Sequence, residues 1–324
     1  MRAIQVHQFG GPDVLVPADL PDPTPGPGQV VVRLAAADVI FLDTLLRGGW
    51  GGDYFPLKPP YVPGGGGAGR VVAVGDGVDP DWIGRRVLAR SSAGYAELIT
   101  TTVVEIVELP DDIDFPEAAA MLHDGVTALL LREAAGEFPE GTWVLVTSAA
   151  GGAGSLLVQL LRASGARVIA AARGERKLNL ARELGAEAVV DYSEAGWQTR
   201  VREATGGAGA HIVYDGAGGE LGRAAFEAVA DGGLFLTYGT SNEDFTVIDP
   251  KVLEARRVDF KNLLEEGSPD KPAVNALMTE ALRLTAKGDI RPAIGATFPL
   301  ERAAEAHASL EARNTVGKSL LLIT

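Results

Sequence analysis

Residues 147–154 read TSAAGGAG, and their types and spacing could bind a phosphate group. Dinucleotide-binding proteins use the pattern G-x-G-x-x-G, in which small residues allow a tight turn and a close approach to a pyrophosphate. Ala149, Gly151 and Gly154 occupy the three places here, with Ala in the first. The alternative is a plain strand-to-helix turn that binds nothing. The flanks favour binding, because an apolar strand-like run precedes the turn and the helix that follows offers free N–H groups to an anion.

Cationic side chains follow at the place where such proteins select their nucleotide. A carboxylate about 20 residues after the glycines would bind the ribose 2′-hydroxyl of NAD. The segment AAARGERK instead supplies Arg173 and Lys177, and Glu175 is the only acid nearby. A guanidinium group can bind a phosphate through two hydrogen bonds. The segment therefore predicts NADP (NADPH), and the alternative is an ordinary solvated helix surface.

The elements around these residues alternate between strands and helices. Apolar runs predict strands at residues 143–149, 167–172, 186–191, 211–218 and 232–239. Helical patterns lie between them at residues 155–164, 175–184 and 220–229. This alternation predicts a doubly wound parallel sheet, an α/β fold buried on both faces.

The first third of the chain has a different pattern. Short apolar or alternating runs, separated by Gly and Pro clusters, predict strands at residues 3–9, 29–39, 69–75, 86–90 and 95–101. Such a pattern is typical of a barrel-like or sandwich domain. A helix at residues 273–287 and a closing helix and strand end the chain.

Composition excludes several classes of site. The 324 residues contain no cysteine, which excludes disulfides, thiolate zinc sites and a cysteine nucleophile. The four histidines are scattered without the spacing of metal ligands. A net charge of −14 argues against binding to nucleic acid or an anionic membrane. The uncharged run from Gly141 to Leu161 is too polar and glycine-rich at its centre to cross a membrane, so we expect a cytoplasmic protein.

The stretch from AAGGAGSLLVQLLRASG to GAEAVVDYSE resembles the cofactor domain of the quinone oxidoreductase (zeta-crystallin-like) branch of the zinc-independent medium-chain dehydrogenase/reductase superfamily. FGGPDVL, FLDTLLRGG, VPGGGGAGRVVAVG, GYAELI and IVYDGAGG also stand in family order. The resemblance implies a GroES-like, β-barrel-type catalytic domain of residues 1–122 and 264–324. It also implies a Rossmann dinucleotide-binding domain of residues 123–263, and a homodimer that pairs through a sheet edge near residues 258–263.

The resemblance further implies which residues contact the cofactor. They are Thr127 at the start of a helix, the turn residues Ala149, Gly151, Gly152, Ala153 and Gly154, and the more distant Arg173, Lys177, Tyr192, Gly216, Gly239, Thr240 and Arg313. For Tyr192 the alternative is ordinary packing after a strand.

The substrate end departs from the family pattern. Ile40 replaces a usual Asn, Leu45 replaces a common Tyr, and Gly66 replaces the acid of the zinc-dependent relatives. These changes and an aromatic segment predict an apolar pocket formed by Ile40, Leu45, Trp50, Tyr54 and Phe55. The alternative is a surface loop packed on itself.

Without zinc, nothing in the sequence is suited to activating an alcohol, so reduction of an electron-poor acceptor is favoured. We expect hydride transfer from NADPH to a quinone or another α,β-unsaturated carbonyl, with His123, Tyr54 or solvent as the proton donor. For His123 the alternative is a histidine satisfied by backbone at a helix start. The rival functions are an enoyl or biosynthetic ketone reductase of the same superfamily, or a non-catalytic NADPH-binding structural or sensor protein.

Overall fold

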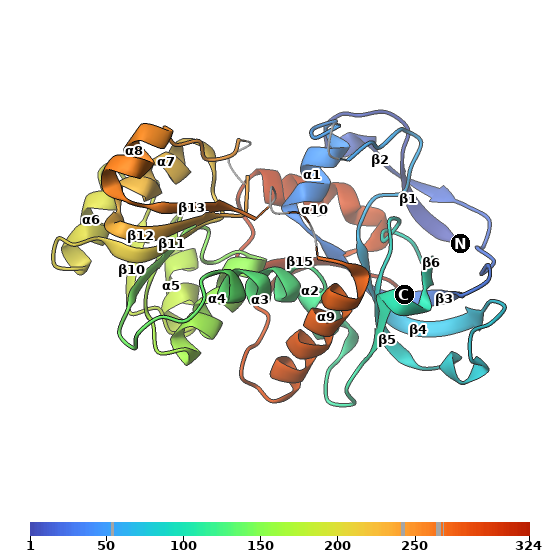
Figure 1. The fold of residues 1–324 in the computed structure, drawn as a ribbon. Coiled ribbons are helices and arrows are strands. Elements are labelled where there is room, and N and C mark those ends of the chain that lie inside the picture. The colour runs from blue at the N-terminus through green and yellow to red at the C-terminus, as the bar shows by residue number, and fades with distance from the viewer. Residues whose placement is uncertain (53–54, 241–243, 264–266, 268) are drawn as a thin grey trace. The chain divides into compact units, whose positions relative to one another are not determined.

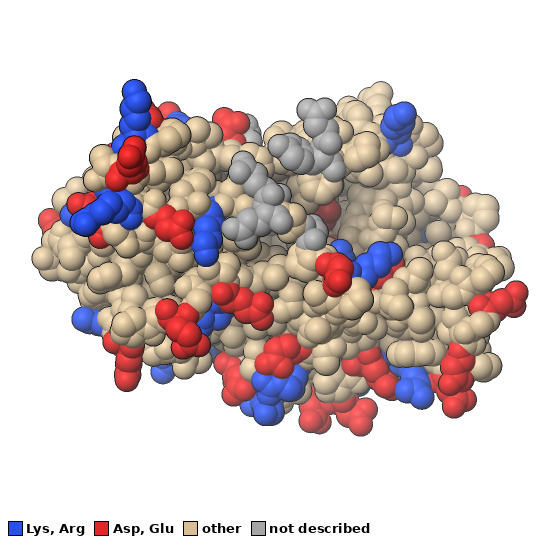
Figure 2. Space-filling model, in the orientation of Figure 1, with Lys and Arg blue, Asp and Glu red and all other residues tan. Residues whose placement is uncertain are grey.

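A computed structural model describes residues 1–52, 55–240, 244–263, 267 and 269–324. The chain divides into two compact units (Figure 1), one of Met1–Val126 with Asp270–Thr324 and the other of Thr127–Pro269. Acidic and basic side chains are interspersed over the face shown in Figure 2. None of the helices in the described ranges is long and apolar enough to cross a membrane.

The first unit is built on a seven-stranded sheet in the order β14-β15-β3-β4-β5-β7, with β6 paired to β3. Glycines bring β4 close to β3, because a Cβ on Gly67 would lie 2.1 Å from the carbonyl oxygen of Ala36. A two-stranded sheet joins β1 to β2. The strands are β1 (Arg2–Val6), β2 (Leu15–Asp19), β3 (Gln29–Val39), β4 (Gly66–Val74), β5 (Arg86–Arg90), β6 (Leu98–Thr102), β7 (Ile106–Glu108), β14 (Ile294–Pro299) and β15 (Lys318–Leu322).

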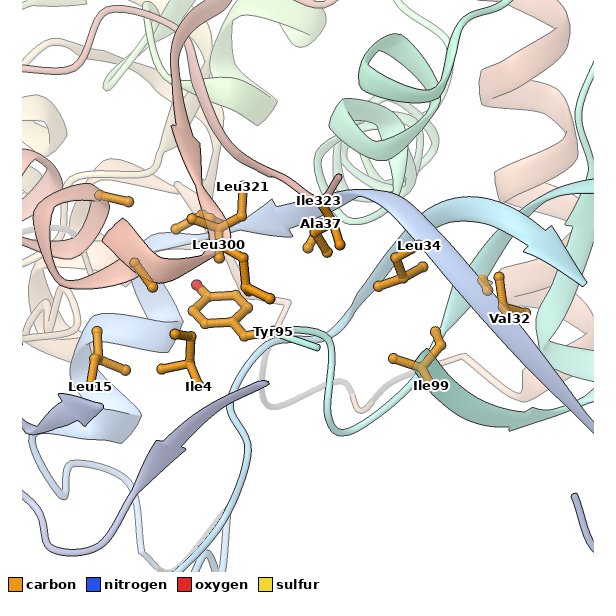
Figure 3. Packing of buried hydrophobic residues seen from close by; sticks show 14 of the residues in the cluster. Ile4, Leu15, Val32, Leu34, Ala37, Tyr95, Ile99, Leu300, Leu321 and Ile323 are labelled. Atoms are coloured by element: carbon orange, nitrogen blue, oxygen red, sulfur yellow. The ribbon is translucent and has the colours of Figure 1, made fainter. Parts of the chain in front are cut away.

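Four described α-helices lie wholly within this unit: α1 (Phe41–Arg47), α2 (Phe115–Met121), α9 (Lys271–Ala286) and α10 (Ala303–Glu311). Asp114 begins α2 because its carboxylate accepts a hydrogen bond from Glu117 N at 2.7 Å, which satisfies a free donor of the first turn. Figure 3 shows the core, in which Tyr95 lies among Ile4, Leu300 and Leu321.

The second unit is a parallel six-stranded sheet in the order β10-β9-β8-β11-β12-β13. The order reverses between β8 and β11, and ligands bind at such switch points in open α/β sheets. The strands are β8 (Trp143–Val146), β9 (Arg167–Ala172), β10 (Ala188–Asp191), β11 (Ala210–Asp215), β12 (Val229–Thr237) and β13 (Asp259–Asn262).

Helices cover both faces of this sheet. From β8 the chain first moves toward β10 and later from β11 toward β13, in opposite directions along the sheet. Because connections between parallel strands are right-handed, α4 and α5 lie on one face and α7 and α8 on the other (Figure 1). The helices are α4 (Gly152–Ala163), α5 (Glu175–Glu183), α6 (Trp197–Ala204), α7 (Gly219–Glu227) and α8 (Pro250–Arg256).

Most predicted elements of the second unit are confirmed within a few residues, and its doubly wound sheet is as predicted. The helix α3 (Asp124–Ala134) corrects one detail, because Thr127 is its fourth residue and does not open it. The helices α6 and α8 were not predicted. The uncharged run from Gly141 to Leu161 is divided between β8, a turn and α4, as expected.

Candidate functional site

The glycine-rich turn joins the end of β8 to the start of α4. Gly151 caps this helix without a side-chain hydrogen bond, so no side chain of its own competes for the N–H groups of the first turn. A Cβ on Gly154 would lie 2.4 Å from Ser148 O, so only glycine fits there. A Cβ on Gly151 would approach only Ser148 O, at 3.3 Å. The turn therefore has the form of a phosphate cradle, and Gly154 is needed for packing.

The two predicted cations lie where β9 ends and α5 begins. Arg173 is exposed, and Lys177 is half-buried in the first turn of α5. The nearby acid, Glu175, is paired with Arg182 at 2.6 Å. This arrangement fits a 2′-phosphate better than a ribose hydroxyl, because the guanidinium group of Arg173 lies open to solvent.

Asp191, which sequence reasoning missed, lies beside these cations. Its carboxylate accepts hydrogen bonds from Gly174 N at 2.8 Å and Ser193 N at 2.9 Å. Burial opposes ionisation, but a hydrogen bond from Ser193 Oγ at 2.5 Å, the two backbone bonds and the charge of Arg173 together lower the pKa of Asp191. Asp191 thus shapes the loop before α5. Its neighbour Tyr192 packs edge-on against Trp197, with ring centroids 6.3 Å apart, and its contact with a nucleotide stays a prediction.

A second missed carboxylate, Asp215, organises the loops at the carboxyl ends of the strands. It accepts hydrogen bonds from Thr147 Oγ1 at 2.9 Å and Thr246 Oγ1 at 2.6 Å. Burial raises the pKa of Asp215, although these bonds oppose the shift. The predicted loop residues lie next to it: a Cβ on Gly239 would be 2.6 Å from Gly216 O. Thr240 is buried. The sequence signal was an Asp at the end of a strand followed directly by GAGG.

In the first unit, His123 belongs to a cluster of charged side chains. Its Nδ1 lies 2.5 Å from Asp38 Oδ2. Lys318 Nζ is paired with Asp38 Oδ1 and, at 2.7 Å, with Asp124 Oδ2. Asp38 and Lys318 are 1% and 3% exposed, whereas the His123 side chain is 28% exposed. The alternative for His123 was a ring hydrogen-bonded to backbone at a helix start. Its Nδ1 instead contacts a carboxylate.

The imidazole of His123 lines a polar cavity of about 370 Å³. The ring lies over Gly65, because a Cβ there would be 2.2 Å from His123 Cε1 and 2.6 Å from Nε2. The other lining residues are mostly hydroxyl-bearing or charged: Gln29, Arg90, Ser91, Ser92, Thr100, Thr101, Thr102 and Glu105.

The residues predicted to form an apolar pocket follow one another along α1 and the turn after it. Ile40 caps α1, and Trp50 N donates to Leu45 O at 3.0 Å. Phe55 N donates to Gly51 O at 2.7 Å. Ile40, Leu45, Trp50 and Phe55 are all half-buried. Tyr54 lies outside the described residues. These bonds show a segment that folds on itself, and the pocket stays a prediction.

Arg313 has a different neighbour from the one expected. Its guanidinium lies 4.7 Å from the centroid of the Phe41 ring, at the start of α1. Its contact with a cofactor stays a prediction. No group of three or more His, Asp or Glu side chains in the described ranges is arranged to hold a metal ion.

A buried hydrogen-bonded chain that the sequence did not reveal links α1 to α10. Tyr95 Oη donates to Asp43 Oδ2 at 2.9 Å and lies 2.9 Å from His307 Nε2. Arg47 Nη1 lies 3.3 Å from His307 Nδ1. Burial, and then the charge of Arg47, lowers the pKa of His307 to about 3. Burial raises the pKa of Asp43 to about 6.

Comparison with known proteins agrees with this geometry. Residues 26–111 match the family model of the alcohol dehydrogenase GroES-like domain, and residues 152–284 match that of zinc-binding dehydrogenases. A quinone oxidoreductase of Pseudomonas aeruginosa is 34% identical over 99% of both chains. A 2-haloacrylate reductase of Burkholderia is 31% identical, also over 99% of both chains.

Solved structures give the same result. A mycobacterial protein complexed with NADPH is 35% identical, with a TM-score of 0.90, and the match covers 99% of this chain and 100% of that one. A quinone oxidoreductase of Escherichia coli complexed with NADPH is 29% identical, with the same TM-score and coverage.

Proposed function

Because the chain belongs to the quinone oxidoreductase branch of the medium-chain dehydrogenase/reductase superfamily, we propose that it is an NADPH-dependent reductase of quinones or other α,β-unsaturated carbonyls. The observation that carries the proposal is the glycine turn at the start of α4, with Arg173 exposed at the end of the neighbouring strand. Two relatives of the same fold were solved with NADPH, which supports this choice of cofactor.

The residues of the second unit fit this nucleotide. The N–H groups of Gly152 and Ala153, in the first turn of α4, are suited to a pyrophosphate. Arg173 and Lys177 are suited to a 2′-phosphate. The carboxylate of Glu175, the nearby acid, is paired with Arg182. When bound, NADPH supplies the hydride.

His123 is the proposed proton donor. Reduction of a carbonyl or enone leaves negative charge on the acceptor oxygen, and a donor within hydrogen-bond reach stabilises that charge. The ring of His123 is 28% exposed and lines a cavity, so it can meet both an acceptor and water. No metal is required in this scheme, and the absence of cysteine from the sequence supports it.

The proposed acceptor is a bulky hydrophobic quinone or enone. The half-buried apolar side chains of Ile40, Leu45, Trp50 and Phe55 would bind it. Each buried methylene group contributes about 0.8 kcal/mol, so each added carbon should lower the Michaelis constant about fourfold.

A second candidate is the reduction of a small anionic alkene, such as an acrylate. A 2-haloacrylate reductase is among the relatives. The polar cavity beside His123 also contains Arg90, Ser91 and Ser92, which suit a carboxylate better than a hydrophobic ring, and one acid, Glu105.

The cofactor assignment is tested by measuring the dissociation constants of NADPH and NADH. Charged hydrogen bonds contribute about 1.5–3 kcal/mol each, so the Arg173→Ala, Lys177→Ala double variant should lose at least one decade of its preference for NADPH. Arg176→Ala, which removes an exposed neighbouring cation, is the matched control and should keep the preference. Equal wild-type affinities for the two cofactors would contradict the assignment.

The acceptor is tested by NADPH oxidation with alkyl- and aryl-substituted quinones, enones and acrylates, beside primary alcohols with NADP⁺. Activity that rises with apolar size supports the first candidate, and activity confined to acrylates supports the second. Efficient alcohol oxidation, or activity that a chelator removes together with stoichiometric zinc, would refute the reaction class. Tight NADPH binding without turnover of any acceptor would favour the sensor alternative.

A further inference from the structure

The cluster around His123 is assembled by the sheet of the first unit. Asp38 near the end of β3 is paired in register with Leu320 of β15, so Lys318 lies two residues away on the neighbouring strand. Side chains in this diagonal relation can reach each other. Asp124 begins α3, directly after His123. The carboxylate of Asp38 on β3 thus contacts the imidazole, and behind it Lys318 of β15 is paired with both Asp38 and Asp124.

We propose that Asp38 is a positioning residue, held by Lys318 and Asp124, that binds Nδ1–H of His123 and leaves Nε2–H to donate the proton to the reduced acceptor. This inference rests on the proposed function for the identity of the acceptor. The contact between Asp38 and His123 can be tested without it.

The tautomer follows from the partners of Asp38. An ammonium group lies against one oxygen and the imidazole against the other. Burial opposes ionisation, but Lys318 and His123 outweigh it and lower the pKa of Asp38. An ionised carboxylate only accepts hydrogen bonds, so Nδ1 carries a hydrogen. The remaining nitrogen, Nε2, is then the one that gains and loses a proton.

Asp38 and Lys318 are almost fully buried, where an unpaired charge is costly, and their opposite charges offset each other. The pair therefore keeps an ionised carboxylate oxygen available to Nδ1–H of His123.

The surroundings of Nε2 allow the proton to leave and return. In the proposed step the Nε2–H bond breaks and an O–H bond forms on the acceptor, whose carbon has received the hydride from NADPH. His123 is left neutral and keeps its Nδ1–H on Asp38. Water in the cavity can restore the Nε2 proton, since the ring is 28% exposed. Gly65 leaves the space that the ring occupies.

The first test needs no cofactor. Nitrogen NMR of the full chain with ¹⁵N-labelled histidine resolves four histidines, and His123→Gln assigns one of them. We expect a hydrogen on Nδ1 of His123, with a far-downfield proton that shifts upfield in Asp38→Asn. The matched control Asp43→Asn removes another buried carboxylate, which binds Tyr95, and should leave this signal in place. An unprotonated Nδ1, or no change in Asp38→Asn, would overturn the inference.

The second test is kinetic. Asp38→Asn should lower kcat on the order of 100-fold, the usual contribution of a general acid, with little change in the affinity for NADPH. The solvent deuterium isotope effect on kcat should rise, because proton transfer becomes slower. A merely structural role would leave that isotope effect unchanged.

A second variant keeps the inference testable if Asp38→Asn does not fold. Gly65→Ala keeps Asp38 and Lys318 but places a Cβ where the ring lies, so kcat should fall in the same way. If the wild type is active and both folded variants match it, the inference is wrong and His123 is not the proton donor, whereas the NADPH-dependent reduction of the acceptor stands. If the wild type fails to oxidise NADPH with every acceptor tested, the proposed function fails. NMR alone then decides whether Asp38 holds His123.

Discussion

At the scale of single residues, His123 and His307 show how partners set the state of an imidazole. His307 is fully buried between Arg47, which can only donate, and Tyr95. Its Nδ1 must therefore accept, and its Nε2–H donates to Tyr95 Oη, which in turn donates to Asp43. Only a neutral His307 satisfies this series of hydrogen bonds, whereas the carboxylate beside His123 requires only that Nδ1 carry a hydrogen.

The hydrogen-bonded series from Arg47 to Asp43 predicts opposite effects of pH on stability from His307 and from Asp43. Below about pH 6.5 the unfolded chain protonates His307, but the folded chain, with a pKa of about 3, does not, so stability falls as the pH falls. Asp43 has a folded pKa of about 6, above its ordinary value, so its contribution to stability falls as the pH rises from about 4 to 6. The two effects oppose each other in the wild type.

Urea unfolding at pH 7, 6 and 5 separates these effects. From pH 6 to 5, the free energy of unfolding of the wild type relative to His307→Gln should fall by up to about 1.4 kcal/mol. Relative to Asp43→Asn it should rise over the same interval. Parallel pH curves for the wild type and His307→Gln would show that His307 is not held neutral.

At the scale of elements, the turn between β8 and α4 contains two glycines that we predict to have different roles, one in packing and one in cofactor binding. Gly154→Ala places a Cβ 2.4 Å from Ser148 O, so we expect a loss of stability of about 1–3 kcal/mol. Gly151→Ala meets only Ser148 O at 3.3 Å, so stability should change little while NADPH binding weakens. Thermal unfolding and NADPH titration of both variants measure this. Equal losses of stability would contradict the division of roles.

The elements were predictable from sequence because their signals are local. Runs such as QVVVRLAAADV and RVIAAA became β3 and β9 with the predicted bounds, and Gly151 lies where the helix begins. The start of α3 was placed at Thr127, three residues too late, on the basis of the family resemblance. The helices α6 and α8 were missed because they are short and largely polar.

The side-chain clusters could not be predicted in the same way, because they depend on which distant elements the fold brings together. Asp38 and His123 are 85 residues apart in the chain, and Tyr95 and His307 are 212 apart. His123 itself was recognised as a candidate, but nothing in its neighbourhood in the sequence indicates Asp38 or Lys318. Asp215 was missed because its partner hydroxyl groups, on Thr147 and Thr246, lie outside its own motif.

At the scale of the whole molecule, the edges of the parallel sheet bear on assembly. Among the described strands, β13 has a single neighbour, β12, and lies at one edge, whereas β10 lies at the other. Phe260 of β13 stacks on Phe235 of β12, with ring centroids 5.6 Å apart, which holds the edge strand against the core. An ordered edge with free N–H and C=O groups can pair with the same edge of a second copy.

We therefore predict a homodimer that pairs through β13. Light scattering at micromolar concentration should give twice the chain mass of 33.7 kDa. Amide hydrogen exchange over Asp259–Asn262 should slow as the concentration rises, because pairing protects the edge amides. The opposite edge, β10, is the internal control, and exchange over Ala188–Asp191 should not depend on concentration. A monomeric mass would refute the dimer. Concentration-dependent protection of β10 in place of β13 would show that the copies pair through β10 and that the predicted edge is wrong.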